Sequence, residues 1–282
     1  MTESLAGALR ETLGGWQADL PVAWRALLND VELGFDASDP DLTIEPWEPI
    51  FPARLGRTFP GAPKGAHIFR SFDGIEPDDV RCVILGQDPY PAPDFATGRA
   101  FEAGNVAEWR ELDKMFSKSV RAYMQLICAA RTGRADYARS FQDWPSLLAD
   151  IEQGSIDLQP ADQLASHWIG QGALLLNSSF TLSRFKVETD PHQSRGHLPV
   201  WRPLILKVLE AMAGSGRPMV FMAFGDVAMD CLKMAGLESS TGNCHTIQRP
   251  HPAEADAMLA LENPFLACNR FFASVGAKPI AW

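Results

Sequence analysis

The sequence lacks the features of membrane, secreted and metal-binding proteins. No apolar run approaches the roughly 20 residues that a membrane-spanning helix requires. The first residues, Met1-Thr2-Glu3-Ser4, have neither the basic start nor the apolar centre of a signal peptide, so we expect a cytoplasmic protein. The 5 cysteines are scattered singly, without the paired spacing of zinc or iron–sulfur sites. We therefore expect reduced, mostly buried thiols, no metal and no cofactor.

Positive charge is also scarce. The chain has 25 Lys and Arg residues against 35 Asp and Glu residues, a formal net charge of -10. Proteins that bind nucleic acid usually gain affinity by replacing phosphate counterions with Lys and Arg, so this balance argues against such a partner. Net charge does not report distribution, however. Five basic residues lie in or near the candidate site segments described below, either as solvated surface charges or as a cluster on one face: Arg184, Lys186, Arg195, Arg202 and Arg249.

What the sequence does contain is enough apolar material for one large domain, with 282 residues of which 46% are hydrophobic. Four apolar runs have the length and composition of buried strands: residues 80–85, 173–176, 219–224 and 244–247. Helical segments separate them, including one around residues 162–169 and one that begins after Gly225-Asp226. This alternation predicts an α/β fold, with a mainly parallel central sheet of about four strands and helices on both faces.

The remaining parts of the chain are assigned by pattern. Residues 1–50 are expected to form a helical packing segment, because Leu5, Leu9 and Leu13 recur at helical spacing and Pro21 precedes a second such pattern. Residues 51–79 are rich in Pro and Gly, so we expect surface loop. Residues 80–282 would be the catalytic core of the single domain.

Polar side chains follow three of the predicted strands directly. The first strand ends in Gly86-Gln87-Asp88-Pro89-Tyr90-Pro91, the second in Asn177, and the fourth leads to Arg249-Pro250-His251-Pro252. In an open α/β sheet, ligands bind outside the carboxyl ends of the strands. Taken singly, each residue has a plainer interpretation: Asp88 and Asn177 as caps of their own turns, and His251 as a structural loop histidine.

With these residues in view, the chain resembles the uracil-DNA glycosylases, enzymes that cut uracil out of DNA. The first motif is nearly the family's Gly-Gln-Asp-Pro-Tyr-His, Leu174-Leu175-Leu176-Asn177 matches its Leu-Leu-Leu-Asn strand end, and His251-Pro252 begins its His-Pro-Ser-Pro-Leu loop. Weaker similarity runs from Ile50-Phe51-Pro52 to Trp282. The resemblance implies a monomeric repair enzyme that hydrolyses the N-glycosidic bond with water, without an amine nucleophile. It would release free uracil from single-stranded or duplex DNA and leave an abasic site.

The resemblance also assigns the chemistry of bond cleavage. Cleavage leaves positive charge on the sugar and negative charge on the base. Asp88 matches the acid that stabilises the sugar cation and orients the water. His251 matches the neutral imidazole that donates to the uracil oxygen as charge develops there.

The uracil pocket follows from the same matches. Asn177 matches the amide that pairs with the uracil edge and rejects cytosine, which presents the opposite donor and acceptor pattern. Phe101, in Gly98-Arg99-Ala100-Phe101, matches the ring on which uracil stacks. Tyr90 matches the ring that excludes the methyl group of thymine, and Gln87 would contribute mainly its backbone. Without the motif, aromatic residues at such places are more often core.

The sequence departs from the family at the residues that open DNA. Pro91 replaces the last histidine of the first motif. Ala255 stands where a leucine wedges into the base stack, and Glu254 puts negative charge where phosphate is expected. Met258, Leu259 or Leu261 would then form a rebuilt wedge, unless there is none. Further DNA contacts are expected from Ser119, the candidate for the serine of the family's Pro-Ser loop, and from Arg184 and Arg249.

Two alternatives to a uracil-specific glycosylase stay open. The altered loop after His251 would suit a glycosylase that accepts other damaged bases. A catalytically weak module that binds uracil or abasic DNA is the alternative from another class, although binding alone would not need the acid at Asp88.

Overall fold

The computed structural model describes residues 2–114, 118–184 and 190–282, and its centre is a four-stranded parallel sheet. The strands are β3 (Cys82–Gly86), β4 (Ala173–Asn177), β5 (Met219–Phe224) and β6 (Cys244–Arg249). Their spatial order is β4-β3-β5-β6, and all neighbouring pairs are parallel. Every residue of β3, β4 and β5 is buried, which explains their uninterrupted apolar sequences. The predicted α/β fold with about four strands is confirmed.

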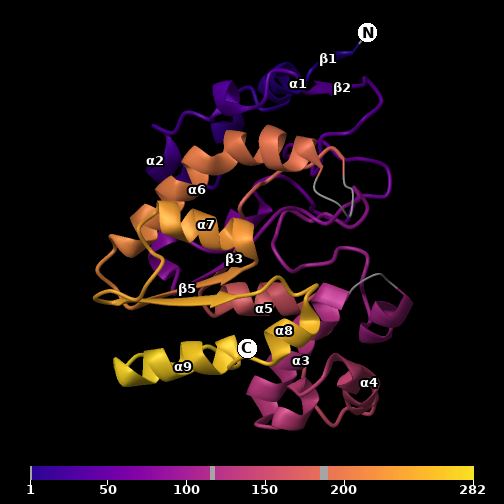
Figure 1. Ribbon diagram of the computed structural model, residues 1–282, viewed down its shortest axis with the longest axis vertical. Coiled ribbons are helices and arrows are strands. Elements are labelled where there is room, and N and C mark those ends of the chain that lie inside the picture. The colour runs from indigo at the N-terminus through magenta and orange to yellow at the C-terminus, as the bar shows by residue number, and fades with distance from the viewer. Residues whose placement is uncertain (1, 115–117, 185–189) are drawn as a thin grey trace.

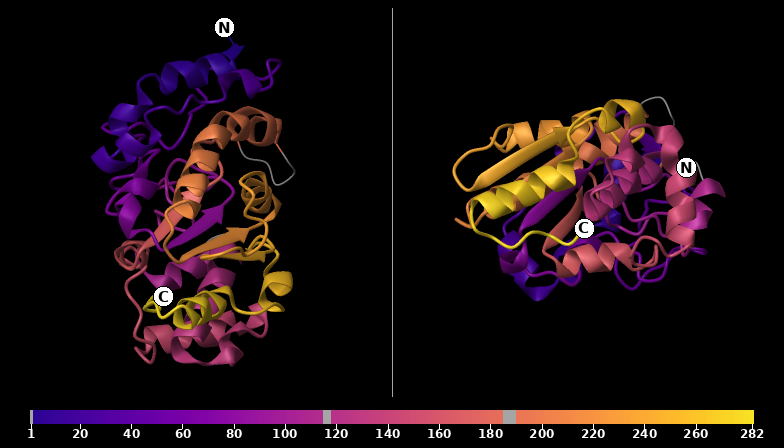
Figure 2. Two further views of the ribbon diagram at one scale, coloured as in Figure 1. Left: turned by 90° about the vertical axis from the view of Figure 1, so that its left-hand side faces the viewer. Right: turned by 90° about the horizontal axis from the view of Figure 1, so that it is seen from below.

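Helices cover both faces of this sheet, as predicted (Figures 1 and 2). On one face lie α6 (Leu198–Ala213) and α7 (Asp226–Met234). On the other lie α5 (Leu164–Gly170) and α9 (Pro264–Ser274), with α3 (Lys118–Thr132) and α4 (Trp144–Glu152) farther along the molecule. The short helix α8 (Ala255–Leu259) follows β6 and contacts α3.

The N-terminal segment forms an outer layer against α6 (Figure 1). It contains α1 (Leu5–Thr12) and α2 (Val22–Leu28), together with the antiparallel pair β1 (Glu3–Ser4) and β2 (Thr43–Ile44). Leu5, Leu9 and Trp24 are fully buried, and the Trp24 indole donates to the carbonyl of Ile75 at 2.7 Å. The two predicted N-terminal helices are therefore confirmed. The β1–β2 pair was not predicted, because two-residue strands leave no periodic signal.

Residues 51–79 were expected to be surface loop, and this is wrong in part. Regular structure is limited to short 3-10 turns at Arg70–Phe72 and Pro77–Asp79. Ile68, Phe69 and Phe72, however, are fully buried, and the rings of both phenylalanines pack on Phe180. The segment thus contributes an aromatic layer to the core. Cysteines were correctly expected in the core, since all 5 are free and buried. Within the described ranges, no helix is long and apolar enough to cross a membrane.

Candidate active site

The candidate site lies at the carboxyl edge of the sheet, at the point where the strand order reverses. From β3 the chain passes to β4 on one side, whereas β5 passes to β6 on the other side. Such a reversal leaves a crevice between the two strands that diverge, here β3 and β5. Asp88 follows β3 by two residues, and His251 follows β6 by two residues. Because neighbouring strands lie about 4.8 Å apart, β3 and β6 are separated by roughly 10 Å, enough for a planar base between their ends.

Asp88 has a carboxyl group that titrates near neutrality. Burial raises its pKa to about 7, and a hydrogen bond from Gln87 acts in the opposite direction. That bond joins Gln87 Nε2 to Asp88 Oδ2 at 3.4 Å. Among the described residues, no backbone amide donates to this carboxylate, so Asp88 is not the cap of its own turn. A half-buried acid with a raised pKa is suited to charge stabilisation or general base catalysis.

Gln87 was expected to act mainly through its backbone. That contact with the base stays a prediction. The Gln87 side-chain amide donates to Asp88, and its carbonyl accepts from the Ser179 amide at 2.9 Å. Ser178 reaches the carbonyl of Gly86 in the same way, from both its amide at 2.9 Å and its hydroxyl at 2.8 Å. These bonds extend the β3–β4 pairing beyond the strands and tie the loop that carries Asp88 to the loop after Asn177.

His251 is held as a neutral donor. Its Nδ1 accepts from the amide of Ala253 at 3.2 Å, and burial lowers the pKa of the imidazole below its ordinary value. A neutral ring whose Nδ1 accepts carries its proton on Nε2, so Nε2–H is left to donate. The negative charge of Glu254 raises the pKa, but by less than burial lowers it.

Gly225, at the end of β5, sets the position of the His251 ring. Its φ is +90°, and a Cβ atom there would lie 3.2 Å from His251 Cβ and 3.3 Å from Cδ2. The glycine therefore serves both the turn into α7 and the close approach of the imidazole. In the sequence this residue indicated only the start of a helix, so its part in the site was missed.

Asn177 and Phe101 converge on Gly86. A Cβ atom at position 86 would lie 2.9 Å from Asn177 Oδ1 and 3.5 Å from Phe101 Cε2. Asn177 is 2% exposed, and no residue in the described part of the chain hydrogen-bonds its side-chain amide. An amide at the end of a strand with no partner among these residues can donate to and accept from a ligand, which favours a binding role over that of a loop cap.

Phe101 is strained at its backbone and fixed at its ring. It is the one non-glycine among the described residues with a positive φ, +60°, a conformation that costs about 1–3 kcal/mol. Its ring stacks on Tyr123 at a centroid distance of 4.5 Å and an angle of 3°, and its edge meets Phe224 at 5.2 Å. Tyr123 supports one face of the ring, which is the geometry of a stacking platform. Tyr90 is half-buried against the same core, and burial raises its pKa, so its hydroxyl stays neutral.

The residues predicted to contact DNA are mostly engaged elsewhere. Arg184 forms an ion pair with Glu48, and Arg249 donates from Nε and Nη2 to the carbonyl of Glu262 at 3.0 and 2.7 Å. Ser119 lies half-buried in the first turn of α3. Lys186 lies outside the described residues. These assignments stay predictions, and the two arginines would have to exchange present partners for phosphate.

Met258 and Leu259 were predicted as candidates for the wedge, and the structure places both in the core. Met258 is fully buried and Leu259 is 6% exposed, because α8 turns both side chains into the core. Ala255, the residue aligned with the wedge leucine, is also fully buried. Leu261, the third candidate, is 47% exposed just beyond α8. Its neighbour Glu262 is held to the end of β6 by Arg249.

Among the described residues, no group of three His, Cys, Asp or Glu side chains could hold a metal ion.

The chain is similar in sequence to bacterial uracil-DNA glycosylases, although no family model matches it. It is 29% identical to uracil-DNA glycosylase 1 of Streptomyces coelicolor over 232 residues, which cover 80% of this chain and 82% of the relative. Identity to the Mycobacterium tuberculosis uracil-DNA glycosylase is 27%, covering 78% and 80%. Identity to that of Exiguobacterium sibiricum is 26%, covering 92% and 97%.

Solved structures show the same fold. The wild-type UNG of Nitratifractor salsuginis superposes with a TM-score of 0.62 at 22% identity, covering 97% of both chains. A mimivirus UNG in complex with UGI superposes with a TM-score of 0.54 at 18% identity, covering 84% of this chain and 77% of that one. The four-stranded sheet and its flanking helices thus form a known architecture.

Proposed function

We propose that this chain, a divergent member of the uracil-DNA glycosylase family, hydrolyses the N-glycosidic bond between uracil and deoxyribose in DNA. The products would be free uracil and an abasic site, and the enzyme would act as a monomer. One observation carries the proposal: the carboxyl edge of a single sheet brings together a carboxylate with a pKa of about 7, an amide and a neutral imidazole, and in the described part of the chain neither the amide nor the imidazole Nε2–H has a partner. Binding without catalysis would not need the first of these.

Asp88 and His251 divide the charge that develops as the bond breaks. The sugar gains positive charge, which the Asp88 carboxylate stabilises while it orients the attacking water. The departing base gains negative charge on its oxygen, and the Nε2–H of His251 donates to it. Because the two groups follow β3 and β6, on either side of β5, the scissile bond would lie over the end of β5.

Asn177, Phe101 and Tyr90 supply the choice of base. The Asn177 carboxamide accepts from the uracil ring N–H and donates to the adjacent oxygen, a pattern that cytosine does not match. Phe101 provides the stacking face, supported from behind by Tyr123. Tyr90 closes the space that the methyl group of thymine would need.

DNA binding is the part of the proposed function in which the sequence departs most from the family motifs. With Arg184 and Arg249 engaged by Glu48 and by a backbone carbonyl, contact with phosphate would be weak and salt-sensitive. Among the large apolar side chains that are exposed in the described residues, Leu261 is the first to follow His251 in the sequence, and we assign the wedge to it.

Base release from oligonucleotides that contain one uracil tests this proposal. Single-stranded and duplex substrates are incubated with purified protein, and abasic sites are detected by alkaline cleavage. Asp88→Asn is the matched control, because it keeps the shape of the side chain. Uracil release by the wild type alone supports the proposal. Binding of the oligonucleotides without release would identify a binding module, and release of other damaged bases in preference to uracil would identify a broader glycosylase.

A further inference from the structure

A buried ion pair lies next to Phe101, the residue of the candidate site with a strained backbone. Arg99 and Glu102 flank it in the sequence, and Arg99 Nη1 lies 3.3 Å from Glu102 Oε1. Their side chains are 7% and 8% exposed. Charged residues are rarely buried to this extent unless they are paired, so the pair is a built feature rather than a surface contact.

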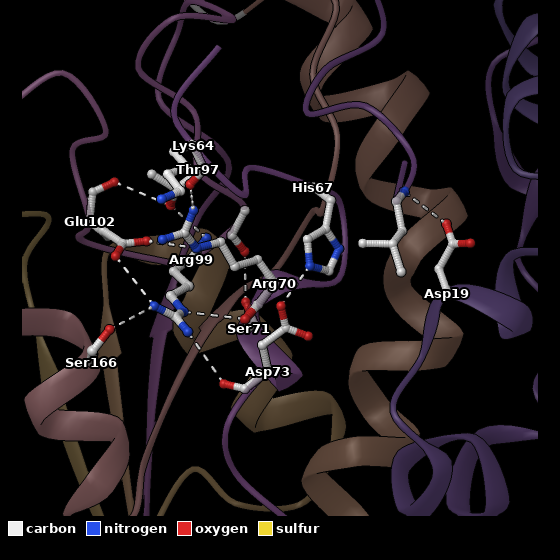
Figure 3. Close-up of polar contacts among 12 residues, drawn as sticks. Asp19, Lys64, His67, Arg70, Ser71, Asp73, Thr97, Arg99, Glu102 and Ser166 are labelled. Carbon is white, nitrogen blue, oxygen red and sulfur yellow. Dashed lines mark hydrogen bonds and ion pairs between the residues drawn. The ribbon is translucent and has the colours of Figure 1, made fainter. Parts of the chain in front are cut away.

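Arg99 uses its planar guanidinium to join three segments of the chain (Figure 3). Besides Glu102, its donors reach the carbonyl of Arg70 at 3.2 Å, the carbonyl of Asp73 at 3.3 Å and the hydroxyl of Ser166 at 3.5 Å. Glu102 Oε2 in turn lies 3.5 Å from Arg70 Nε. The guanidinium therefore fixes the loop that carries Phe101 to residues 70–73 and to α5.

The backbone on both sides of Phe101 is also held. The Ala100 amide donates to the carbonyl of Leu175 in β4 at 3.3 Å, and Thr97 Oγ1 donates to the carbonyl of Glu102 at 3.5 Å. The ring itself packs on Tyr123 at 4.5 Å and on Phe224 at 5.2 Å. The backbone bonds on both sides of residue 101 thus leave its neighbours little freedom to relax the positive φ.

We propose that the Arg99–Glu102 ion pair is a positioning device for base recognition: it holds Phe101 in its left-handed backbone conformation and so sets the ring against Tyr123 before the base arrives. Arg99 and Glu102 are positioning residues, since they act through Phe101. This inference rests on the proposed function, in which Phe101 stacks on uracil. Without the pair, the backbone at residue 101 would relax toward negative φ and the ring would leave its place beside Gly86.

Single-turnover uracil release at saturating enzyme is the first test. Arg99→Met is expected to slow release about 10-fold, because small displacements of a substrate-positioning group have large effects on rate. Arg99→Lys should recover part of the rate, since it keeps the charge facing Glu102 but loses the fork that reaches the carbonyls. The control is Arg54→Met, which breaks the Arg54–Asp19 pair, whose side chains are 13% and 11% exposed. It should lower the urea midpoint while leaving the release rate unchanged.

A double-mutant cycle between Arg99 and Phe101 distinguishes a positioning role of the ion pair from an effect on stability alone. In a Phe101→Leu background, Arg99→Met is expected to change the release rate less than 2-fold, because no aromatic ring remains to be positioned. A full 10-fold loss in that background would overturn the proposal, as would an equal loss of rate in Arg54→Met.

A second cycle is independent of activity. Glycine adopts a positive φ without strain, so Arg99→Met should shift the urea midpoint less in a Phe101→Gly background than in the wild type. Equal shifts in the two backgrounds would overturn the positioning role. If the wild type releases no uracil, the proposed function fails while this unfolding cycle still decides whether the pair holds Phe101.

Discussion

The two sides of the crevice are built differently. On the β3–β4 side, the loops after Gly86 and Asn177 are joined by backbone hydrogen bonds that continue the strand pairing, and the Phe101 loop is fixed by the buried Arg99–Glu102 pair. On the β6 side, His251 rests on Gly225, and Arg249 ties the segment after α8 to the end of the strand. The first side carries the carboxylate and the groups for base recognition. The second carries the imidazole and the loop of the expected wedge, and there the sequence departs furthest from the uracil-DNA glycosylases.

The comparison teaches that the residues that open DNA can change while the residues that cleave the glycosidic bond stay the same. Bond cleavage and base recognition depend on a carboxylate, an amide and a ring in fixed positions, so their supports cannot change freely. Extrusion of the base depends on an apolar side chain outside the core and on surface charge. Substitutions such as Glu254 and Ala255 alter these without disturbing the sheet.

The largest effect is expected on the β3–β4 side, from Asp88→Asn. Single-turnover release should fall on the order of 100-fold or more, because the lost charge acts mainly in the transition state. The affinity for uracil-containing DNA should stay within a few fold of wild type, or rise, since a buried negative charge is removed. Fluorescence anisotropy and rapid-quench assays measure the two quantities. Near wild-type release would remove Asp88 from the mechanism.

The pKa of the same carboxyl group predicts how the rate of uracil release depends on pH. Asp88 must be ionised to act, and its pKa of about 7 means that release should rise with pH through that value and fall below it. His251, with a lowered pKa, is already neutral in this range and should add no second limb there. Rates measured from pH 5 to 9 check this. A profile that is flat across pH 6 to 8 would show that the carboxyl titrates elsewhere.

On the β6 side, His251→Ala is expected to slow release roughly 10- to 100-fold through loss of the donor to the base. Gly225→Ala should act in the same direction, because its Cβ atom would lie 3.2 Å from that of His251 and because φ at this position is +90°. Circular dichroism distinguishes a displaced imidazole from an unfolded protein. Normal release by folded His251→Ala would give this loop another role.

A smaller effect is expected from Gly86→Ala on the opposite side. The added methyl group would lie 2.9 Å from Asn177 Oδ1 and would turn the amide away from the uracil edge. Release should fall about 10-fold with some loss of stability, because the amide must turn and the Ala100 Cβ atom would lie only 3.3 Å from the added methyl group. Asn177→Ala is the matched comparison. If Gly86→Ala further slowed the Asn177→Ala variant by the same factor, the methyl group would not act through the amide.

The sequence predicts the residues at the strand ends better than the contacts that hold them. Asp88, Asn177 and His251 could be located because each follows an apolar strand, and parallel strands end at one edge. The burial of Met258 and Leu259 could not be predicted, because an apolar pair after a loop fits either a wedge or the inner face of a short helix. The Arg99–Glu102 pair and the contact between Gly225 and His251 depend on long-range packing, which leaves no periodic signal.

The smallest effect concerns strand preference. Extruding a paired base costs a few kcal/mol in lost pairing and stacking, whereas a base in a single strand is already partly free. With Ala255 buried and Glu254 repelling phosphate, Leu261 alone would offset this cost, so the wild type should release uracil several-fold faster from single strands than opposite adenine. Leu261→Ala should slow the duplex reaction about 3-fold further and leave the single-strand reaction unchanged. Val275→Ala, a control at an equally exposed apolar residue beyond α9, should change neither. Equal rates on both substrates, unaffected by Leu261→Ala, would mean that base extrusion relies on neither this side chain nor a wedge.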